Sequence, residues 1–243
     1  MIKIKSQKFG FTLAEVLITL GIIGVIAAMT VPNLMSKISK KQVEIQAKAA
    51  YSTIAQAMKF SEYEETSAMP VAANNVASMK QWFDTFLAPH LKVENICFQQ
   101  PGCWHKKGAV KTLNNTEPSF ETAVGLNDST LGWATVTFRT SKGVYFNLDG
   151  SSVGTTASLF GVDVPSQSMQ FYFDVNGDRK PNVIGKDIYI MVYNESVGLV
   201  PAGHSRSIAQ VDNNCLNGNG YWCLSKLKRE GWVISDRVWK RKR

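Results

Sequence analysis

The sequence predicts an α+β fold: one long N-terminal helix whose first half crosses a membrane and whose second half packs on a four-stranded antiparallel sheet. Three observations predict it. An uninterrupted apolar run extends from Phe11 to Val31, and apolar residues recur at helical spacing from Leu34 to about Glu64. After Leu131, apolar and polar residues alternate as they do in strands.

The apolar run has the length of a membrane span. As a helix, its 21 residues would extend ~31 Å, which matches the hydrocarbon core of a bilayer. An ordinary secretory signal cut near Val25-Ile26-Ala27 and a plain uncleaved anchor are the alternatives. Neither explains Glu15, the only charge in the run, because a carboxylate there costs about 2.5–3.5 kcal/mol. Glu15 therefore indicates a function.

The residues from Lys8 to Ile18, KFGFTLAEVLI, resemble the processing signature of type IV prepilins and of the pseudopilins of type II secretion. The resemblance implies that a prepilin peptidase cuts between Gly10 and Phe11 and methylates the new amine of Phe11. It also implies that Glu15 acts in assembly, and that Pro32 bends the helix by removing a backbone hydrogen bond.

The resemblance also sets the expected location of the protein. Counting positive charges does not choose an orientation, because three lysines precede the apolar run and three follow it: Lys3, Lys5, Lys8, Lys37, Lys40 and Lys41. Cleavage of a cytoplasmic leader implies a single-pass inner-membrane protein with an extracytoplasmic head, and a periplasmic or extracellular filament after assembly. The implied partners are the peptidase, other pilin or pseudopilin subunits and an inner-membrane assembly platform.

Beyond Pro32 the helix is expected to be amphipathic. Its apolar positions are Leu34, Ile38, Ile45, Ala49, Ile54 and Met58, and its charged positions, on other faces, are Lys37, Lys41, Glu44 and Lys48. The expected organisation is thus a leader at 1–10, a transmembrane and amphipathic helix at 11–64, and a globular head at 65–243.

Four strands are predicted in the head. Residues around Val136 and Phe138 alternate, Ser141-Lys142-Gly143 supplies a turn, and a second alternating run follows from Val144 to Leu148. Met169–Asp174 and Asp187–Tyr193 are the other two. A short helix is expected within Gln81–Leu91, and a loop around Asn114, Asn115 and Pro118.

The even number of cysteines favours disulfides in an exported head. Of the three connectivities that Cys97, Cys103, Cys215 and Cys223 allow, the local one is preferred, because Cys97–Cys103 and Cys215–Cys223 each close a short loop. A metal site at Cys97, Cys103 and His105 is the less favoured alternative. No catalytic motif includes any of the three histidines, so no enzyme activity is expected.

The segment from Asp174 to Asp187 admits two interpretations. Asp174, Asn176, Asp178 and Asp187 supply oxygen atoms at spacings that a calcium loop uses, although the EF-hand pattern fails. The favoured interpretation is an Asn-Gly turn after a strand. Some pseudopilins bind calcium in a comparable region, so the resemblance keeps Ca²⁺ as a hypothesis for these four residues.

The formal charge of +8 comes mostly from the two ends of the chain. The C-terminal tail carries Arg237, Lys240, Arg241, Lys242 and Arg243 beside Trp239. Contact with DNA is the sharper hypothesis for this tail, and a solvated end is the favoured one.

Taken together, the sequence predicts a structural subunit of a type IV pilus or a type II secretion pseudopilus. Two alternatives stay open: a minor pilin that binds DNA through the basic tail, and a membrane-anchored protein that never polymerises.

Overall fold

The computed structural model describes residues 10–63, 76–118, 135–150, 159–164 and 168–241. The leader with Lys3, Lys5 and Lys8, residues Glu64 and Leu131, and Lys242 and Arg243 of the tail lie outside these ranges. The chain forms two compact units, Met1–Gln42 and Val43–Arg243. Helix α1, Leu13–Tyr63, contributes residues to both.

In the first unit, α1 is apolar and exposed around its whole circumference. Leu13 is 82% exposed, and none of the most apolar 18-residue window of the helix is buried. The helix continues through Pro32, and the bend expected there stays a prediction. A helix that exposes apolar residues on every face is unsuited to water and suited to lipid or to neighbouring helices.

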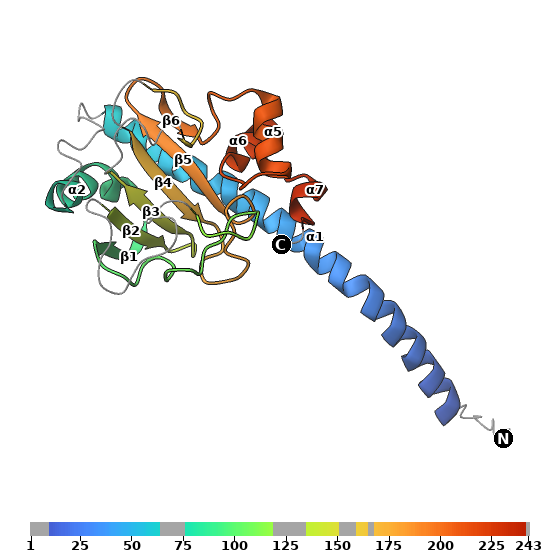
Figure 1. Cartoon of the computed structure of the whole chain (residues 1–243). Helices are drawn as coiled ribbons and strands as arrows, with labels where there is room; N and C mark the ends of the chain where they lie inside the picture. Colours follow the sequence, from blue (N-terminus) through green and yellow to red (C-terminus); the bar gives the residue numbers. More distant parts are fainter. Residues whose placement is uncertain (1–9, 64–75, 119–134, 151–158, 165–167, 242–243) are drawn as a thin grey trace, which may run out of the picture. The chain divides into compact units, whose positions relative to one another are not determined.

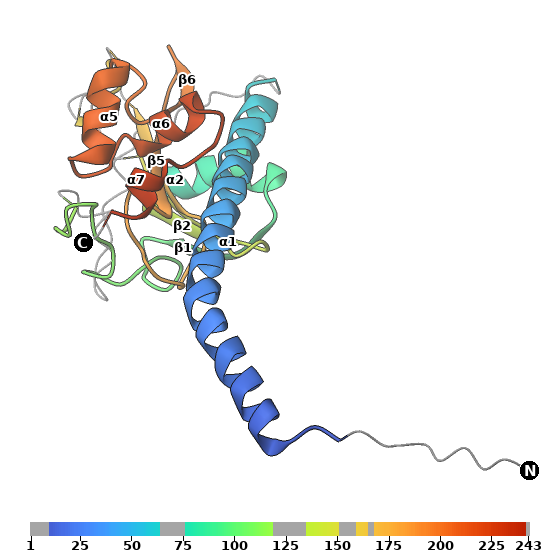
Figure 2. The same ribbon diagram turned by 90° about the vertical axis from the view of Figure 1, so that its right-hand side faces the viewer.

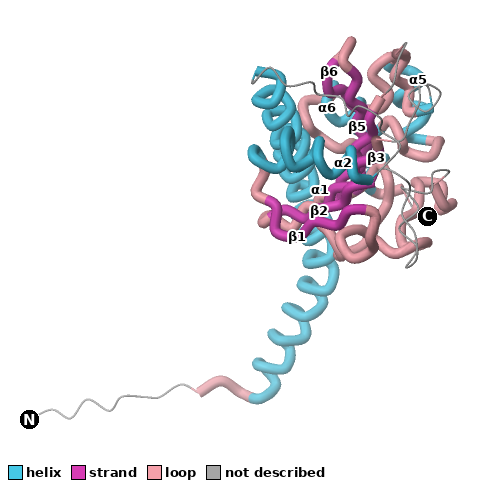
Figure 3. The backbone as a smooth tube through the Cα atoms, turned by 90° about the vertical axis from the view of Figure 1, so that its left-hand side faces the viewer, coloured by secondary structure: helices cyan, strands magenta, loops and turns pink. Residues whose placement is uncertain are grey.

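The second unit is built on a sheet of six antiparallel strands in the order β1-β2-β3-β4-β5-β6 (Figures 1 and 3). The strands are Val93–Phe98, Thr135–Thr140, Tyr145–Asp149, Met169–Asp174, Ile188–Asn194 and Gly198–Pro201. The expectation of an antiparallel sheet is confirmed, and the expected number of four strands is wrong.

The two unpredicted strands are the edges of the sheet. β1 has Glu94 and Asn95 at a register shift next to Val93, and β6 is four residues long and ends at Pro201. Edge strands tolerate charges, irregularities and proline, because one side of their backbone needs no partner strand. These features remove the alternation on which the sequence prediction depends.

A face of α1 packs on the sheet in the second unit. The buried positions are Val43, Glu44, Ala47, Ala50, Tyr51, Ile54, Ala57, Met58 and Ser61. Aromatic residues Phe138, Phe146 and Phe173 lie in the same core. The predicted stripe was partly wrong: Ile54 and Met58 are buried, whereas Ile45 and Ala49 are exposed. Ile45 precedes Ile54 by nine residues, which is two and a half helical turns and therefore the opposite face.

Glu44 was expected on a solvated face and is instead buried, with 4% exposure. Its Oε1 accepts a hydrogen bond from the backbone N–H of Ile234 at 2.9 Å. Nearby, Tyr51 packs against Trp232, and its hydroxyl donates to the carbonyl of Leu199 at 3.0 Å. These contacts fasten α1 to the C-terminal part of the head.

The opposite face of the sheet is covered as well. Tyr172, Ile190 and Val192 lie in a second apolar cluster with Phe160 and Tyr221. On the α1 side, Met79 and Trp82 of α2 (Val76–Trp82) lie in the same core as the helix face. A π-helical turn at Phe83–Leu87 and a 3-10 turn at Ala88–His90 follow α2, in the region where one short helix was expected. The sheet is therefore a buried layer.

Helices α5 (Ile208–Leu216), α6 (Cys223–Arg229) and α7 (Asp236–Trp239) gather beside β5 and β6 (Figure 2). Arg241, two residues after α7, binds the C-terminal end of α5. Its Nη1 donates to the carbonyls of Cys215 (3.3 Å) and Gly218 (3.0 Å), and its Nη2 donates to that of Asn217 (3.2 Å). The expectation of a solvated tail is wrong for Arg241, because a helix C-terminus leaves carbonyls that a guanidinium satisfies well.

Replacing Arg241 with alanine should destabilise the head by about 1–3 kcal/mol, because it leaves partly buried carbonyls without their charged donor. The matched control is Arg237→Ala, which removes the same charge from an exposed position and should change stability by less than about 0.5 kcal/mol. Urea unfolding of a soluble form that begins at Lys37 measures both. Equal effects of the two substitutions would contradict the assigned role of Arg241.

Candidate processing and assembly site

The residues that precede α1 form its N-terminal cap. Thr12 is the last residue before the helix, and its Oγ1 accepts a hydrogen bond from the N–H of Glu15 at 3.3 Å. In return, Oε2 of Glu15 accepts from the backbone N–H and from the hydroxyl of Thr12, both at 2.8 Å. This reciprocal arrangement is a capping box, which satisfies N–H groups that a helix N-terminus otherwise leaves unpaired.

The capping box gives Glu15 a local role that the sequence analysis missed. The signal was present in the sequence as Thr12-Leu13-Ala14-Glu15, a threonine followed three residues later by a glutamate. Gly10 and Phe11 lie just before the cap and outside the helix, and the Phe11 ring is 90% exposed. The bond between them is thus exposed and lies outside the helix.

The cysteines form two local disulfides. Cys97 pairs with Cys103 and Cys215 with Cys223, with Cα–Cα distances of 5.8 and 5.3 Å. The first closes the loop after β1, and the second joins the end of α5 to the start of α6. His105 is not beside a free thiol, since no cysteine is free.

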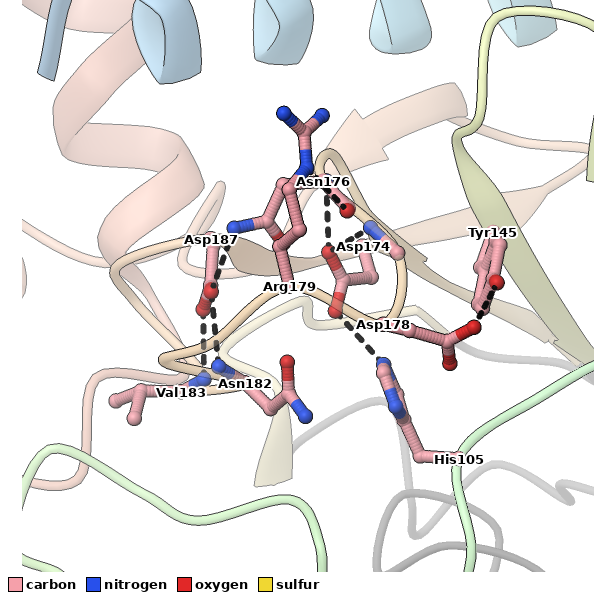
Figure 4. A network of polar contacts seen from close by, with 10 residues as sticks. His105, Tyr145, Asp174, Asn176, Asp178, Arg179, Asn182, Val183 and Asp187 are labelled. Atoms are coloured by element: carbon pink, nitrogen blue, oxygen red, sulfur yellow. Dashed lines mark hydrogen bonds and ion pairs between the residues drawn. The ribbon is translucent and has the colours of Figure 1, made fainter. Parts of the chain in front are cut away.

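The candidate calcium loop contains a buried polar network (Figure 4). At the end of β4, Oδ1 of Asp174 accepts from the N–H groups of Asn176 (2.8 Å) and Gly177 (3.0 Å). Its Oδ2 lies 2.7 Å from Nε2 of His105. Both side chains of this pair are almost fully buried. The histidine is 69 residues away in the chain, so no local motif could have predicted the contact.

Asp187 is bound in a similar way. Its Oδ1 accepts from the N–H of Val183 at 2.6 Å, and its Oδ2 accepts from the N–H of Asn182 at 2.8 Å and from Nδ2 of Asn176 at 3.3 Å. Asp178 lies apart from both carboxylates in the network and accepts from the hydroxyl of Tyr145 at 2.6 Å.

This geometry does not fit a calcium ion. The carboxylate oxygens of Asp174 and Asp187 point at N–H groups or at an imidazole nitrogen, whereas a calcium site needs six to eight oxygen atoms around one point. Within the described ranges, no group of three or more histidine, cysteine, aspartate or glutamate side chains is arranged to hold a metal. The four residues serve instead to hold the β4–β5 loop in shape.

Burial raises the pKa of Asp187 to about 7, and the neighbouring charge of Asp174 adds to the effect, while the hydrogen bonds from Val183, Asn182 and Asn176 oppose it. Burial also raises the pKa of Asp174, against the opposing effect of His105. A proton is therefore held more tightly by these carboxyls in the folded head than in the unfolded chain.

Comparison with known proteins identifies the N-terminal segment. Residues 5–31 match the model of the prokaryotic N-terminal methylation motif. No curated protein and no solved structure matches the chain. The chain therefore carries the prepilin-type signature, and this signature indicates the type IV pilin and pseudopilin class of structural proteins. Among the described residues, α1 is the one helix long and apolar enough to cross a membrane, which agrees with anchoring by this segment.

The raised pKa of Asp187 predicts that the free energy of unfolding of the head falls as pH rises from about 4 to about 7. Below the unfolded-state pKa the carboxyl is protonated in both states. Between the two pKa values, the folded head binds the extra proton, so raising the pH favours unfolding. Asp187→Asn should flatten this part of the profile. Urea unfolding at half-unit pH steps measures it, and an unchanged slope in the variant would contradict the assignment.

Proposed function

We propose that the chain is a prepilin-like structural subunit of a type IV pilus or of a type II secretion pseudopilus. The observation that carries the proposal is the coincidence of the methylation motif at residues 5–31 with the Gly10–Phe11 bond and the glutamate at position 15. In this proposal, residues 1–10 are the leader, prepilin peptidase removes it, and the new amine of Phe11 is methylated. The subunit is not an enzyme.

The proposed organisation follows from the two halves of the N-terminal helix. Residues 11–64 form the helix, whose apolar first part spans the inner membrane, and residues 65–243 form most of an extracytoplasmic head. The apolar positions exposed between Leu13 and Val31 support this, because their burial in lipid or among neighbouring helices removes them from water. The proposed partners are the peptidase, the assembly platform and other subunits.

Glu15 is proposed to act in assembly through its charge. Cleavage after Gly10 leaves a positive amine on Phe11, and in an apolar layer that amine and the carboxylate each cost less when paired. Glu15 is already bonded to the N–H and the hydroxyl of Thr12. A second subunit, staggered along the filament, can bring its own Phe11 amine to the remaining oxygen positions of the carboxylate. The pair would then set the register between subunits.

The alternative of a DNA-binding tail has less support. Arg241, one of the tail's five basic residues, is bonded to three carbonyls of the α5 end and is not free to bind phosphate. Lys240 lies 3.4 Å from Asp236, and this carboxylate offsets part of the positive charge of the tail. The other alternative is a membrane-anchored protein that never polymerises. The presence of the chain in sheared filaments would support the filament subunit, and its absence would support this alternative.

The mature protein should begin at Phe11 and carry a methylated amine. Mass spectrometry of the membrane form, from cells with and without an active prepilin peptidase, measures the terminus. Gly10→Leu should block cutting, because a branched side chain crowds the peptidase site, and Gly10→Ala is the milder control. Recovery of the chain with an intact leader from cells that have an active peptidase would refute the proposal.

Two substitutions at Glu15 separate its charge from its capping role. Glu15→Gln keeps an acceptor at the third helical position, which a capping box allows, and removes the charge. Glu15→Val removes both. If the charge sets the register, both variants should be cut normally but depleted at least tenfold from sheared filaments. Normal incorporation of the Gln variant alongside loss of the Val variant would mean that capping, and not charge, is what assembly needs.

A further inference from the structure

One end of the sheet in the head carries an exposed group of cations. This basic rim consists of Lys92, Lys106, Lys107, Lys142, Arg179 and Lys180, all of them exposed. They come from segments that are far apart in the sequence: the start of β1, the loop after Cys103, the β2–β3 turn and the β4–β5 loop. No motif in the sequence brings them together.

Backbone contacts join these segments to one another. The N–H of Ser141, next to Lys142, donates to the carbonyl of Lys92 at 3.3 Å. A Cβ on Gly177 would lie 3.1 Å from the carbonyl oxygen of Gly143, so the β4–β5 loop touches the β2–β3 turn.

The remaining segment is attached by the buried pair of His105 and Asp174. This pair brings Lys106 and Lys107 to the end of β4. Figure 4 shows His105, Asp178 and Arg179 around the same loop. The segments that carry the six cations therefore meet at one end of the sheet.

The end of the sheet that carries the basic rim has fewer carboxylates than cations. Asp178 is exposed but accepts the hydrogen bond of Tyr145, and Glu94 is exposed beside Lys92. Lys111 and Glu117 form a pair at 3.3 Å, as do Lys240 and Asp236 at 3.4 Å, and each pair is neutral. The rim thus keeps an excess of positive charge that no described carboxylate cancels.

The rim lies at the end of the sheet where α1 enters the head. Tyr189 is the second residue of β5. Burial raises the pKa of Tyr189, and the charges of Asp187 and then of Glu44 add to this effect, so the Glu44 carboxylate lies near the start of the strand. At the other end, Oε1 of Glu62 accepts from the hydroxyl of Tyr193 at 3.2 Å. The first residues of α1 in this unit are therefore beside the start of β5, which follows the β4–β5 loop of the rim.

The chain leads from this end directly to the apolar segment. Val43 follows Val31 by 12 residues, which is at most about 18 Å of helix. The lipid headgroup layer covers about 5–7 Å of that length, and an extended lysine side chain reaches about 6 Å. Attraction between a lysine and anionic headgroups acts over a Debye length of about 8 Å at physiological ionic strength. Lys37, Lys40 and Lys41 lie within the same interval.

We propose that the basic rim contacts anionic lipid headgroups while the subunit is anchored in the membrane before assembly. This inference rests on the proposed anchoring by α1. The rim would hold the head close to the bilayer through phosphate contacts, and it would release the head when the subunit leaves the lipid for a filament. A polybasic surface next to a membrane segment fits this role because each cation near an anionic surface strengthens binding about fivefold.

Amine footprinting of the full chain in lipid nanodiscs tests the proposal. Discs of phosphatidylcholine alone are compared with discs that contain about one third phosphatidylglycerol, and mass spectrometry follows acetylation of individual lysines. Lys106, Lys107 and Lys142 should react about tenfold more slowly in the anionic discs, and 0.5 M salt should abolish the difference. Lys59 and Lys80, exposed and away from the rim, should react at equal rates in both.

A pair of double variants provides the matched control. Lys107→Gln with Lys180→Gln removes two rim charges and should reduce the protection of Lys142 at least fivefold. Lys59→Gln with Lys80→Gln removes the same charge elsewhere and should leave that protection unchanged.

Equal acetylation rates in the two lipids would overturn the inference. Protection of the rim by a short DNA duplex in neutral discs, without protection by anionic lipid, would overturn it in favour of nucleic acid. Co-elution of the chain with discs of either lipid reports on anchoring alone. Failure to co-elute counts against the proposed function, whereas co-elution with equal rates counts against the lipid contact only.

Discussion

The packing of one face of α1 on the sheet is the interaction on which the head depends. Small residues Ala47, Ala50 and Ala57 on the helix lie in one apolar core with the large aromatic side chains of the sheet, which fill the space between the two elements. The C-terminal segment covers this contact, since the N–H of Ile234 binds the buried carboxylate of Glu44. The same helix is apolar on all sides in its first part, where the described residues of its own unit offer it no such partner. One continuous helix therefore has two surface patterns, and the change from one to the other marks where the head begins.

The sequence predicted the elements that repeat a simple pattern and missed those that depend on neighbours. The strands β2 to β5 and the turn at Ser141–Gly143 lie where periodicity and turn residues placed them. β1 and β6 were missed because edge strands need not alternate. The helix stripe was mistaken in part because Ile45 continues the apolar series of Leu34 and Ile38, and Ile45 is exposed within the second unit. Apolar character alone does not indicate which face is buried when part of a helix has another environment.

The residues of the candidate sites also fall into two groups, those that a local sequence pattern predicts and those that depend on neighbours brought by the fold. Gly10, Phe11 and Glu15 belong to a contiguous motif, and the capping box of Thr12 and Glu15 could also have been found from its spacing. The loop at Asp174 could not, because the donors that satisfy its carboxylates are backbone N–H groups and a histidine brought from 69 residues away. Acidic residues at alternate positions are compatible with a cation or with a hydrogen-bonded turn, and only the direction of the surrounding N–H groups distinguishes the two.

The total charge of the chain is a poor guide to its partners, because the charged residues have different roles in different parts of the chain. Three lysines lie in the leader that processing would remove. Arg241 completes the end of α5 with hydrogen bonds that a mobile tail could not make. The six cations of the basic rim gather only after the sheet has formed, through the contacts of Lys92 with Ser141 and of His105 with Asp174. The formal charge of +8 therefore combines leader lysines, a guanidinium that caps α5 and cations gathered at one end of the sheet, so the position of each charge says more about its role than the sum does.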